Sequence, residues 1–472
     1  MITLQTPGTG FDDFESRIAL GLCRVALDCV EPDKLTLEES FDRYLVHIDM
    51  DEAKKDNLTK SLSLWCLRLL ADEEFLGQKI SIRPRWRKQQ ASRISNFGMD
   101  AQKEQAFQDI FQKYEGVNQR TRKGSQDSSC GHAYQEEKVF GALEEVFSPQ
   151  LGQPPKRDDI TRQETLDLCP SCGVLGLLGT ASFQLIISLK RRGTTIMEKY
   201  FMMPRFRGEI NGESLLSYIA TVKHIRPSFY DVSVNSAVLA LLSSYPHLSR
   251  VMQTKERQYP TFFVSRADTS GNVRRYEHFE EKPVEDEIMF LGNNSYNVAL
   301  AQKAYRFSED KPELLGLLSK TLQLKQPQDA ISFYREYASV TEGKSLVYRE
   351  STRYVLKEVL KMEESLIDDP NVGAVASMLR YFVRDRKFGY VDNLRSSRTP
   401  EEFEKHLLSA QRDAASIYHA DRSDKPKPFM PSETNIRKTL QALNDVGKFE
   451  EAKTLICLLA FSFQDKKEVE EQ

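Results

Sequence analysis

The stretch Cys169-Pro170-Ser171-Cys172-Gly173-Val174 decides how the middle of this chain folds. Its two thiols are separated by two residues, and Cys130-Gly131-His132 supplies a further thiol and an imidazole upstream. Together Cys130, His132, Cys169 and Cys172 provide the four nitrogen and sulfur ligands of a tetrahedral structural zinc (Zn2+) site. The alternatives are small buried side chains or a redox pair, and Cys130 and His132 are separated by one residue instead of two.

The other cysteines indicate a reducing compartment. The chain has seven cysteines, an odd number, and its first residues carry neither a basic leader nor an apolar signal core. The most apolar run, 174–189, is too short to span a bilayer. We therefore expect a cytoplasmic protein with reduced thiols and no membrane association. The cysteines outside the predicted zinc site lie in apolar helical stripes and are predicted to be core residues: Cys23, Cys29, Cys66 and Cys457.

The front of the chain mixes helical and strand patterns. The chain has 472 residues, of which 40% are hydrophobic and 29% charged, so two or three globular domains are expected. Apolar residues at helical spacing predict helices over 11–29 and 58–70, and 44–48 reads as a strand. The runs 182–189 and 195–204 predict a β-hairpin whose tip is cationic. Short strands are also predicted at Thr261–Val264 and Ile288–Phe290.

Beyond about residue 297 the pattern becomes helical. Several helices have visible N-caps, such as Thr399 and Ser432. The predicted helices are 299–305, 313–322, 329–337, 351–366, 372–383, 400–418, 432–445 and 449–461. The fold class is therefore predicted as α+β: a mixed N-terminal α/β region with a zinc-knuckle β-hairpin, followed by an all-α C-terminal helical bundle. The predicted domains are an N-terminal α+β domain with the basic segment over 1–128, a Cys-knuckle and hairpin domain over 129–296, and the bundle over 297–472.

Charge is distributed unevenly along the chain. The net charge is −3, but residues 1–60 carry −6, and residues 79–123 carry 11 basic against 4 acidic residues, or +7. Five positive charges fall within residues 83–93, with no acid among them and Trp86 in the middle. Phosphate binding needs an uncompensated positive array, and an aromatic ring adds a stacking surface. The pattern favours nucleic-acid binding, whereas the alternative is an ordinary solvated face.

Nucleic-acid contacts are predicted in three groups. The basic run over 83–93 is predicted to contact phosphates. Two smaller basic clusters, at 120–123 and 190–192, and two arginines after the hairpin add to these contacts. Amide side chains nearby are suited to hydrogen bonds with base edges. The predicted residues are Arg83, Arg85, Trp86, Arg87, Lys88, Gln89, Gln90, Arg93, Asn96, Arg120, Arg122, Lys123, Lys190, Arg191, Arg192, Arg205, Arg207, Asn293 and Asn294. For each amide, an ordinary turn or surface role explains the residue equally well.

Enzyme signatures are missing from the sequence. It contains no Gly-x-x-x-x-Gly-Lys phosphate loop, no His-Glu-x-x-His and no Gly-x-Ser-x-Gly. Its seven histidines are scattered singly, which leaves little for acid–base chemistry. We therefore expect no intrinsic catalysis.

Three segments resemble a known family. Ser16–Ala26, Leu168–Gly176 and Leu379–Asp392 together resemble the large subunit of type I CRISPR Cascade complexes, of the I-A and I-B kinds with paired cysteine knuckles. The resemblance is diffuse but spans most of the chain, and the central cysteine motif is its most specific part. The family pattern has Cys-x-x-Cys twice, whereas this chain has Cys130-Gly131-His132 for the first half.

The resemblance implies a non-catalytic subunit for antiviral defence or transposon targeting. Its N-terminal part would read the protospacer-adjacent motif on target double-stranded DNA and assist duplex opening, while a CRISPR guide RNA reads the sequence. The helical tail would resemble the small subunit that lines the displaced strand. The implied partners are the other Cascade subunits, both backbone and small, and a separate helicase-nuclease or transposition proteins.

Two other classes of protein fit the same residues. One is a zinc-containing nucleic-acid or protein adaptor or regulator outside CRISPR systems, which binds proteins through its helical tail. The other is an enzyme whose metal is held by Cys169, Cys172 and one more ligand and keeps an open position. Copurifying molecules distinguish the three classes.

Overall fold

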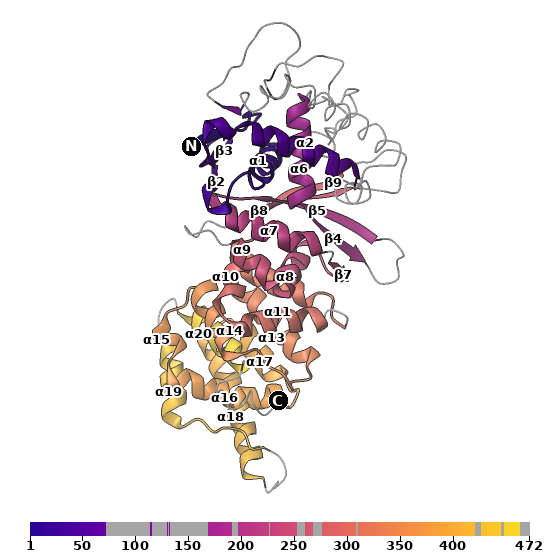
Figure 1. Cartoon of the computed structure of the whole chain (residues 1–472). Coiled ribbons are helices and arrows are strands. Elements are labelled where there is room, and N and C mark those ends of the chain that lie inside the picture. The colour runs from indigo at the N-terminus through magenta and orange to yellow at the C-terminus, as the bar shows by residue number, and fades with distance from the viewer. Residues whose placement is uncertain are drawn as a thin grey trace, which may run out of the picture. The chain divides into compact units, whose positions relative to one another are not determined.

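The chain folds as two compact units (Figure 1). The computed structural model describes residues 1–71, 114–115, 130, 132, 169–190, 197–225, 227–252, 260–267, 276–307, 310–420, 426–444 and 448–462. The first unit comprises Met1–Phe229 and Pro246–Glu285, and the second comprises Tyr230–Tyr245 and Asp286–Gln472. The first mixes helices and strands and the second is helical, so the predicted α+β class with a helical C-terminal region is confirmed.

Of the two predicted domain boundaries, one lies outside the described residues and the other lies inside a helix. The boundary between 128 and 129 lies outside the described residues. Residues 296 and 297 both lie inside helix α11 (Ser295–Arg306). The chain therefore continues as one helix across the second predicted boundary.

Two sheets form the first unit together with its helices, and the pairs β1–β3, β2–β3, β2–β6, β4–β5, β5–β8 and β8–β9 are antiparallel. The smaller sheet has the strand order β1-β3-β2-β6, and the larger has the order β7-β4-β5-β8-β9. The predicted strands at 44–48 and 261–264 are confirmed as β3 and β8. The elements are β1 (Ile2–Gln5), α1 (Asp12–Ala26), β2 (Leu35–Glu39), β3 (Tyr44–Ile48), α2 (Asp56–Ala71), α6 (Pro170–Phe183), β4 (Leu185–Lys190), β5 (Met197–Arg205), β6 (Glu209–Asn211), α7 (Gly212–His224), β7 (Ser228–Tyr230), α9 (Pro246–Val251), β8 (Thr261–Ala267) and β9 (Tyr276–Pro283).

The predicted hairpin strands are antiparallel neighbours. Leu185 at the start of β4 is opposite Met202, and Lys190 at its end is opposite Met197 of β5. The predicted tip residues Arg191 and Arg192 lie outside the described residues. The two predicted strands are thus present and paired with each other.

Helices α1 and α6 cross at two glycines. They lie side by side in Figure 1. A Cβ built on Gly21 would lie 2.0 Å from the carbonyl oxygen of Leu175, and one on Gly179 would lie 2.0 Å from the carbonyl oxygen of Arg17. Neither position has room for a side chain. The two helix backbones can approach this closely only because both residues are glycine.

A buried ion pair lies at the same crossing. Arg17 Nε donates to Asp13 Oδ1 at 2.9 Å, and Arg17 Nη1 donates to Thr180 Oγ1 at 2.8 Å and to Gln184 Oε1 at 2.9 Å. All four side chains are buried. A buried charge is tolerated when it is paired and hydrogen-bonded. The spacing of apolar residues predicted a helix over 11–29, and α1 is buried on nearly every side. Its Arg17 is neutralised by Asp13 of the same helix and donates its other hydrogen bonds to Thr180 and Gln184 at the end of α6.

The second unit is a bundle of helices. All eight helical segments predicted beyond residue 297 contain helix, and the caps at Thr399 and Ser432 are confirmed, since each hydroxyl accepts from the backbone N–H three residues on at 3.2 Å. The helices are α8 (Val234–Ser244), α10 (Glu285–Asn293), α11 (Ser295–Arg306), α12 (Leu314–Leu324), α13 (Pro327–Val340), α14 (Arg349–Tyr354), a π-helical turn (Val355–Val359), α15 (Glu364–Ile367), α16 (Pro370–Arg384), α17 (Gly389–Ser396), α18 (Pro400–His419), α19 (Glu433–Asn444) and α20 (Phe449–Ala460).

Two predictions for this unit were wrong. Ile288–Phe290 was predicted as a strand but lies inside α10, because Val284, Ile288 and Leu291 are buried at helical spacing. Short apolar runs do not distinguish helix from strand. The predicted helix 351–366 is interrupted by the π-helical turn and by Lys361, whose φ is +56°. In the described part of the chain, no helix combines the length and apolarity needed to cross a membrane.

We expect Gly21→Ala to destabilise the first unit by about 3 kcal/mol or more, because the methyl group would overlap the Leu175 carbonyl. Urea denaturation followed by circular dichroism measures the change. Gly389→Ala is the matched control, since a Cβ there has nothing within 4 Å and should leave stability unchanged or raise it by up to about 1 kcal/mol. Equal effects of the two substitutions would show that the helix crossing is not tightly packed.

Candidate metal centre

Four residues predicted as metal ligands come together in the first unit. The ligand atoms of Cys130, His132, Cys169 and Cys172 all lie within 4.8 Å of one another. The three cysteines are buried and His132 is partly buried. This cluster can hold a metal ion, and it brings together two segments that are separated by 36 residues of sequence.

The two later cysteines occupy the start of a helix. Cys169 is the N-cap of α6, and its Sγ accepts a hydrogen bond from the backbone N–H of Cys172 at 3.4 Å. Pro170 follows at the first helical position, where its missing N–H costs nothing. The sequence suggested that these cysteines sit at the base of the β4–β5 hairpin, but the remainder of α6 after Cys172 separates them from β4. Their spacing instead turns both sulfurs towards one side of a helix N-terminus.

The earlier pair completes the cluster. Cys130 Sγ accepts a hydrogen bond from the backbone N–H of Cys169 at 3.4 Å. His132 Nδ1 lies 3.5 Å from Cys169 Sγ and 3.3 Å from Cys172 Sγ. A tetrahedral metal bonded at about 2.1 Å to nitrogen and about 2.3 Å to sulfur separates those atoms by about 3.6 Å. The observed distances are close to that value, so the donor atoms have the spacing that a bound metal requires.

The electrostatics of the cluster favour a cation. Hydrogen bonds with Cys169 and Cys172 hold the pKa of the Cys130 thiol well below its ordinary value of 9.0. Burial, followed by hydrogen bonds with Cys130 and Cys169, raises the pKa of Cys172 well above that value. Burial would lower the pKa of His132, but hydrogen bonds with the sulfurs of Cys130 and Cys169 outweigh it and raise that pKa to about 10. The cluster of buried sulfurs thus stabilises a positive charge, and a divalent ion would interact favourably with all of them at once.

Tyr114 contacts two of the four ligands. Its hydroxyl lies 3.0 Å from Cys172 Sγ, and its ring meets the His132 ring edge-on with 5.2 Å between centroids. Burial and the Cys172 sulfur raise the pKa of Tyr114 well above its ordinary value, so the hydroxyl keeps its proton and can donate it to the sulfur. No motif singled out this residue. The neighbouring Glu115 pairs with Lys55 at 2.9 Å, which fixes this segment to the start of α2.

The remaining cysteines lie outside the cluster. Cys23, Cys66 and Cys457 are buried as predicted, and Cys29 is only partly buried. Burial raises the pKa of Cys66 and of Cys457 to about 12, so these thiols stay protonated. They behave as small apolar core residues.

Two of the predicted nucleic-acid contacts are engaged by carboxylates. Arg205 pairs with Asp12 at 2.6 Å, with Glu39 at 2.9 Å and with Glu281 at 3.2 Å. Arg207 pairs with Glu39 at 3.0 Å and with Glu281 at 2.7 Å. The two guanidinium groups therefore share Glu39 and Glu281, and Arg205 has Asp12 as a third partner. This pairing reduces the positive potential that they can offer to a phosphate.

The other predicted contacts are placed as follows. Lys190 is the last residue of β4. Asn294 caps α11 by accepting from the backbone N–H of Asn297 at 2.9 Å, and its amide also donates to Asn293 at 2.7 Å. This gives Asn294 a structural role at a helix start. The following predicted residues lie outside the described part of the chain: Arg83, Arg85, Trp86, Arg87, Lys88, Gln89, Gln90, Arg93, Asn96, Arg120, Arg122, Lys123, Arg191 and Arg192.

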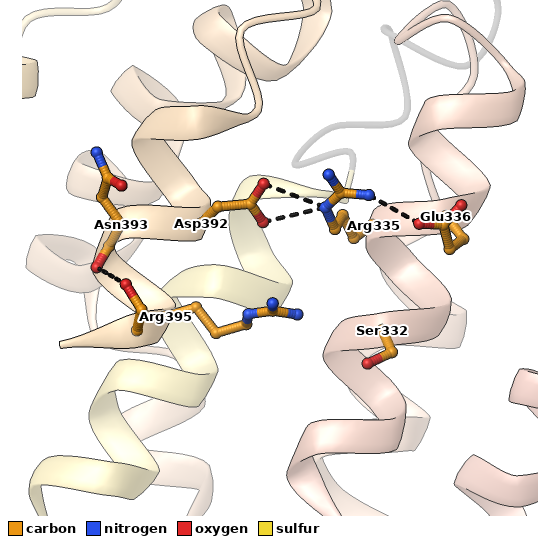
Figure 2. Close-up of a pocket in the computed structure, with 7 residues that line it drawn as sticks. Ser332, Arg335, Glu336, Asp392, Asn393 and Arg395 are labelled. Atoms are coloured by element: carbon orange, nitrogen blue, oxygen red, sulfur yellow. Dashed lines mark hydrogen bonds and ion pairs between the residues drawn. The ribbon is translucent and has the colours of Figure 1, made fainter. Parts of the chain in front are cut away.

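A polar hollow of about 440 Å³ lies between α13 and α17 in the second unit. Figure 2 shows Arg335 reaching across it to Asp392, with 3.1 Å between Arg335 Nε and each carboxylate oxygen. Arg335 also donates to Glu336 at 2.7 Å, while Arg395 extends into the same gap (Figure 2). The positive and negative charges of its walls are equal in number. This hollow links two helices and presents no reactive constellation.

Comparisons with known proteins add no family assignment. Neither the search against protein-family models nor the search of curated proteins finds a match to this chain. Its function must therefore be inferred from its own residues.

We expect the full chain to bind about one Co2+ with an intense sulfur-to-metal charge-transfer band, because three thiolates surround the ion. Cys169→Ser should lose most of this band and bind the ion more weakly. Cys29→Ser removes a thiol outside the cluster and should match the unsubstituted chain. Full binding by Cys169→Ser in a spectrophotometric titration would contradict the assignment.

Tyr114→Phe should release the metal about tenfold faster to a chelator, because the Cys172 sulfur loses a hydrogen-bond donor. The charge-transfer band of the Co2+ form should also move to longer wavelength, since an unbonded sulfur gives up electron density more easily. Tyr218→Phe is the control: Tyr218 is equally buried, and its hydroxyl has no hydrogen-bond partner among the described residues. If both variants behaved alike, the Tyr114 hydroxyl would have no effect on the metal.

Proposed function

We propose that the metal is zinc and that its role is structural. Three sulfurs and one imidazole nitrogen are the ligand set of many structural zinc sites. A catalytic zinc keeps one coordination position open for water or substrate, whereas four protein ligands fill a tetrahedral site. The donor set therefore favours a zinc knuckle over a zinc enzyme.

The centre would anchor the sequence between α2 and α6. Tyr114, Cys130 and His132 all contact the N-terminus of α6, and Glu115 pairs with Lys55 just before α2. The basic block over 79–123 lies in the same part of the sequence, with a net charge of +7. A metal that ties this part of the chain to a packed helix pair would hold the basic block beside a rigid unit.

We infer from this arrangement a non-catalytic subunit that binds nucleic acid. The proposed role is the large subunit of an RNA-guided type I CRISPR Cascade effector. In that role the chain would read the protospacer-adjacent motif, assist duplex opening and recruit a helicase-nuclease or transposition partner. The single observation that carries the proposal is the four-ligand cluster formed by the Cys-x-x-Cys segment that most resembles this family. The helical second unit is consistent with the small-subunit-like tail.

The ion pairs of the first unit reduce the number of predicted residues that would bind nucleic acid. Arg205 and Arg207 are matched by carboxylates, so they contribute less than the sequence alone suggested. The proposal therefore depends mainly on residues 79–123, where basic residues outnumber acidic ones by seven. A zinc-containing adaptor outside CRISPR systems remains the second candidate, and the cationic groove of the helical unit described below favours it.

The test is purification of the full chain from its native host. The proposal predicts about one zinc per chain by elemental analysis and bound short RNA of uniform, repeat-derived length. An adaptor would bring protein partners alone, and an enzyme would show metal-dependent turnover in isolation. If the chain carries no polynucleotide and binds neither added guide nor duplex at low salt, the proposal is wrong.

Reversing three charges of the basic block should weaken binding to all sequences equally. In the triple variant Arg85→Glu, Arg87→Glu and Lys88→Glu, the slope of log affinity against log salt should fall by about 0.9 for each phosphate that the block no longer neutralises. The control reverses three exposed lysines of the acidic segment 1–60 and should change binding little: Lys34, Lys54 and Lys60. Fluorescence anisotropy with labelled duplex and RNA measures both.

A further inference from the structure

The helical unit contains a groove that plays no part in the metal centre or the basic block. It has a volume of about 830 Å³ and follows the exposed face of α16. Its other walls come from α14 and the π-helical turn, from Leu459 of α20, and from the extended segment around Phe429. π-helical turns occur frequently at functional sites. The groove is therefore a candidate binding site in its own right.

Part of the groove lining is apolar or small. Gly373 and Ala374 lie one turn before Ser377 on α16, and all three are partly exposed small residues. Leu356 of the π-helical turn borders this floor, and the Phe429 ring is 53% exposed. Small side chains on a helix face let another backbone approach closely. These residues suit apolar side chains of a bound segment.

The groove lining also carries charged side chains, most of them basic. Five basic side chains line the groove against three carboxylates: Arg349, Arg353, Arg380, Arg384 and Lys427 against Asp368, Asp369 and Asp385. The Arg380 side chain is buried, and its Nη2 donates to the carbonyl oxygen of Leu459 at 2.9 Å. The surplus of positive charge favours an anionic occupant.

The three carboxylates are held by neighbours. Both oxygens of Asp368 accept from Arg353, at 2.6 and 2.8 Å. Asp369 caps α16 by accepting from the backbone N–H of Asn371 at 2.7 Å, and Asp385 pairs with Lys387 at 2.6 Å. Acidic groups are thus fixed parts of the groove, interleaved with the basic ones.

We propose that this groove binds an acidic amphipathic segment of a partner protein. Its apolar side chains would pack on Gly373 and Ala374, and its carboxylates would pair with Arg384 and Lys427. A nucleic-acid strand fits less well, because a phosphate backbone presents continuous negative charge and requires an array without carboxylates. A peptide helix can place its carboxylates opposite the basic groups alone. This inference is independent of the proposed function.

The experiment uses the full chain and a fluorescein-labelled 18-residue helical peptide in which Leu lines one face and Glu the other. Ala374→Trp should weaken peptide binding about tenfold or more by filling the floor, and Arg384→Glu should do so by reversing a charge. Arg412→Glu is the matched control, because Arg412 is exposed on α18 and does not line the groove. Its affinity should stay within about twofold of the unsubstituted chain.

The outcomes separate the possible occupants. A peptide with Lys in place of Glu should not bind, and an oligo-dT probe should bind all three variants equally. If Ala374→Trp and Arg384→Glu weaken oligo-dT binding and leave peptide binding unchanged, the groove is a nucleic-acid site and the proposal is overturned. Equal peptide binding by every variant also overturns it. Circular dichroism tests whether the Ala374→Trp variant is folded. The Arg384→Glu variant changes an exposed side chain, so it tests the proposal without altering Gly373 and Ala374.

Discussion

The close crossing of α1 and α6 is the constraint on which the rest of the first unit depends. Gly21 and Gly179 let the two backbones touch, and Arg17 then finds all its partners within the same contact. A charge buried so completely is stable only in one arrangement of the two helices, because any shift would break its hydrogen bonds. The crossing therefore fixes the axis of α6, and with it the position of Cys169 and Cys172 at its N-terminus.

The cluster of candidate metal ligands is built on this fixed helix end. Cys169 and Cys172 are held by the backbone of α6, and Cys130 and His132 join them from 37 or more residues away. A metal bound by these four residues would close a long stretch of sequence and stabilise the folded state mainly by restricting the unfolded one. Tyr114 adds a hydroxyl on Cys172 and an aromatic edge on His132, so the ligands also have an ordered environment.

A surface of this protein can attract an anionic ligand only where its basic side chains outnumber the carboxylates that pair with them. Arg205 and Arg207 share the carboxylates of Glu39 and Glu281, and Arg335 is matched by Asp392 and Glu336. Such pairs reinforce the fold and offer little attraction to another molecule. The groove along α16 differs because its basic groups outnumber its acidic ones and lie beside an apolar floor. A similar surplus of positive charge occurs in the sequence over 79–123.

Sequence alone determined the features that depend on residues close together in the chain. The four candidate metal ligands were predicted from two short motifs, Cys-x-His and Cys-x-x-Cys, and the helical back of the chain followed from periodicity and from caps such as Thr399. Tertiary structure decided the rest. It brought Tyr114 onto Cys172, placed the cysteines at the start of a helix, made Ile288–Phe290 helical and surrounded Arg205 with carboxylates. These outcomes depend on contacts between residues far apart in the sequence, and packing energies of that kind leave no local pattern to read.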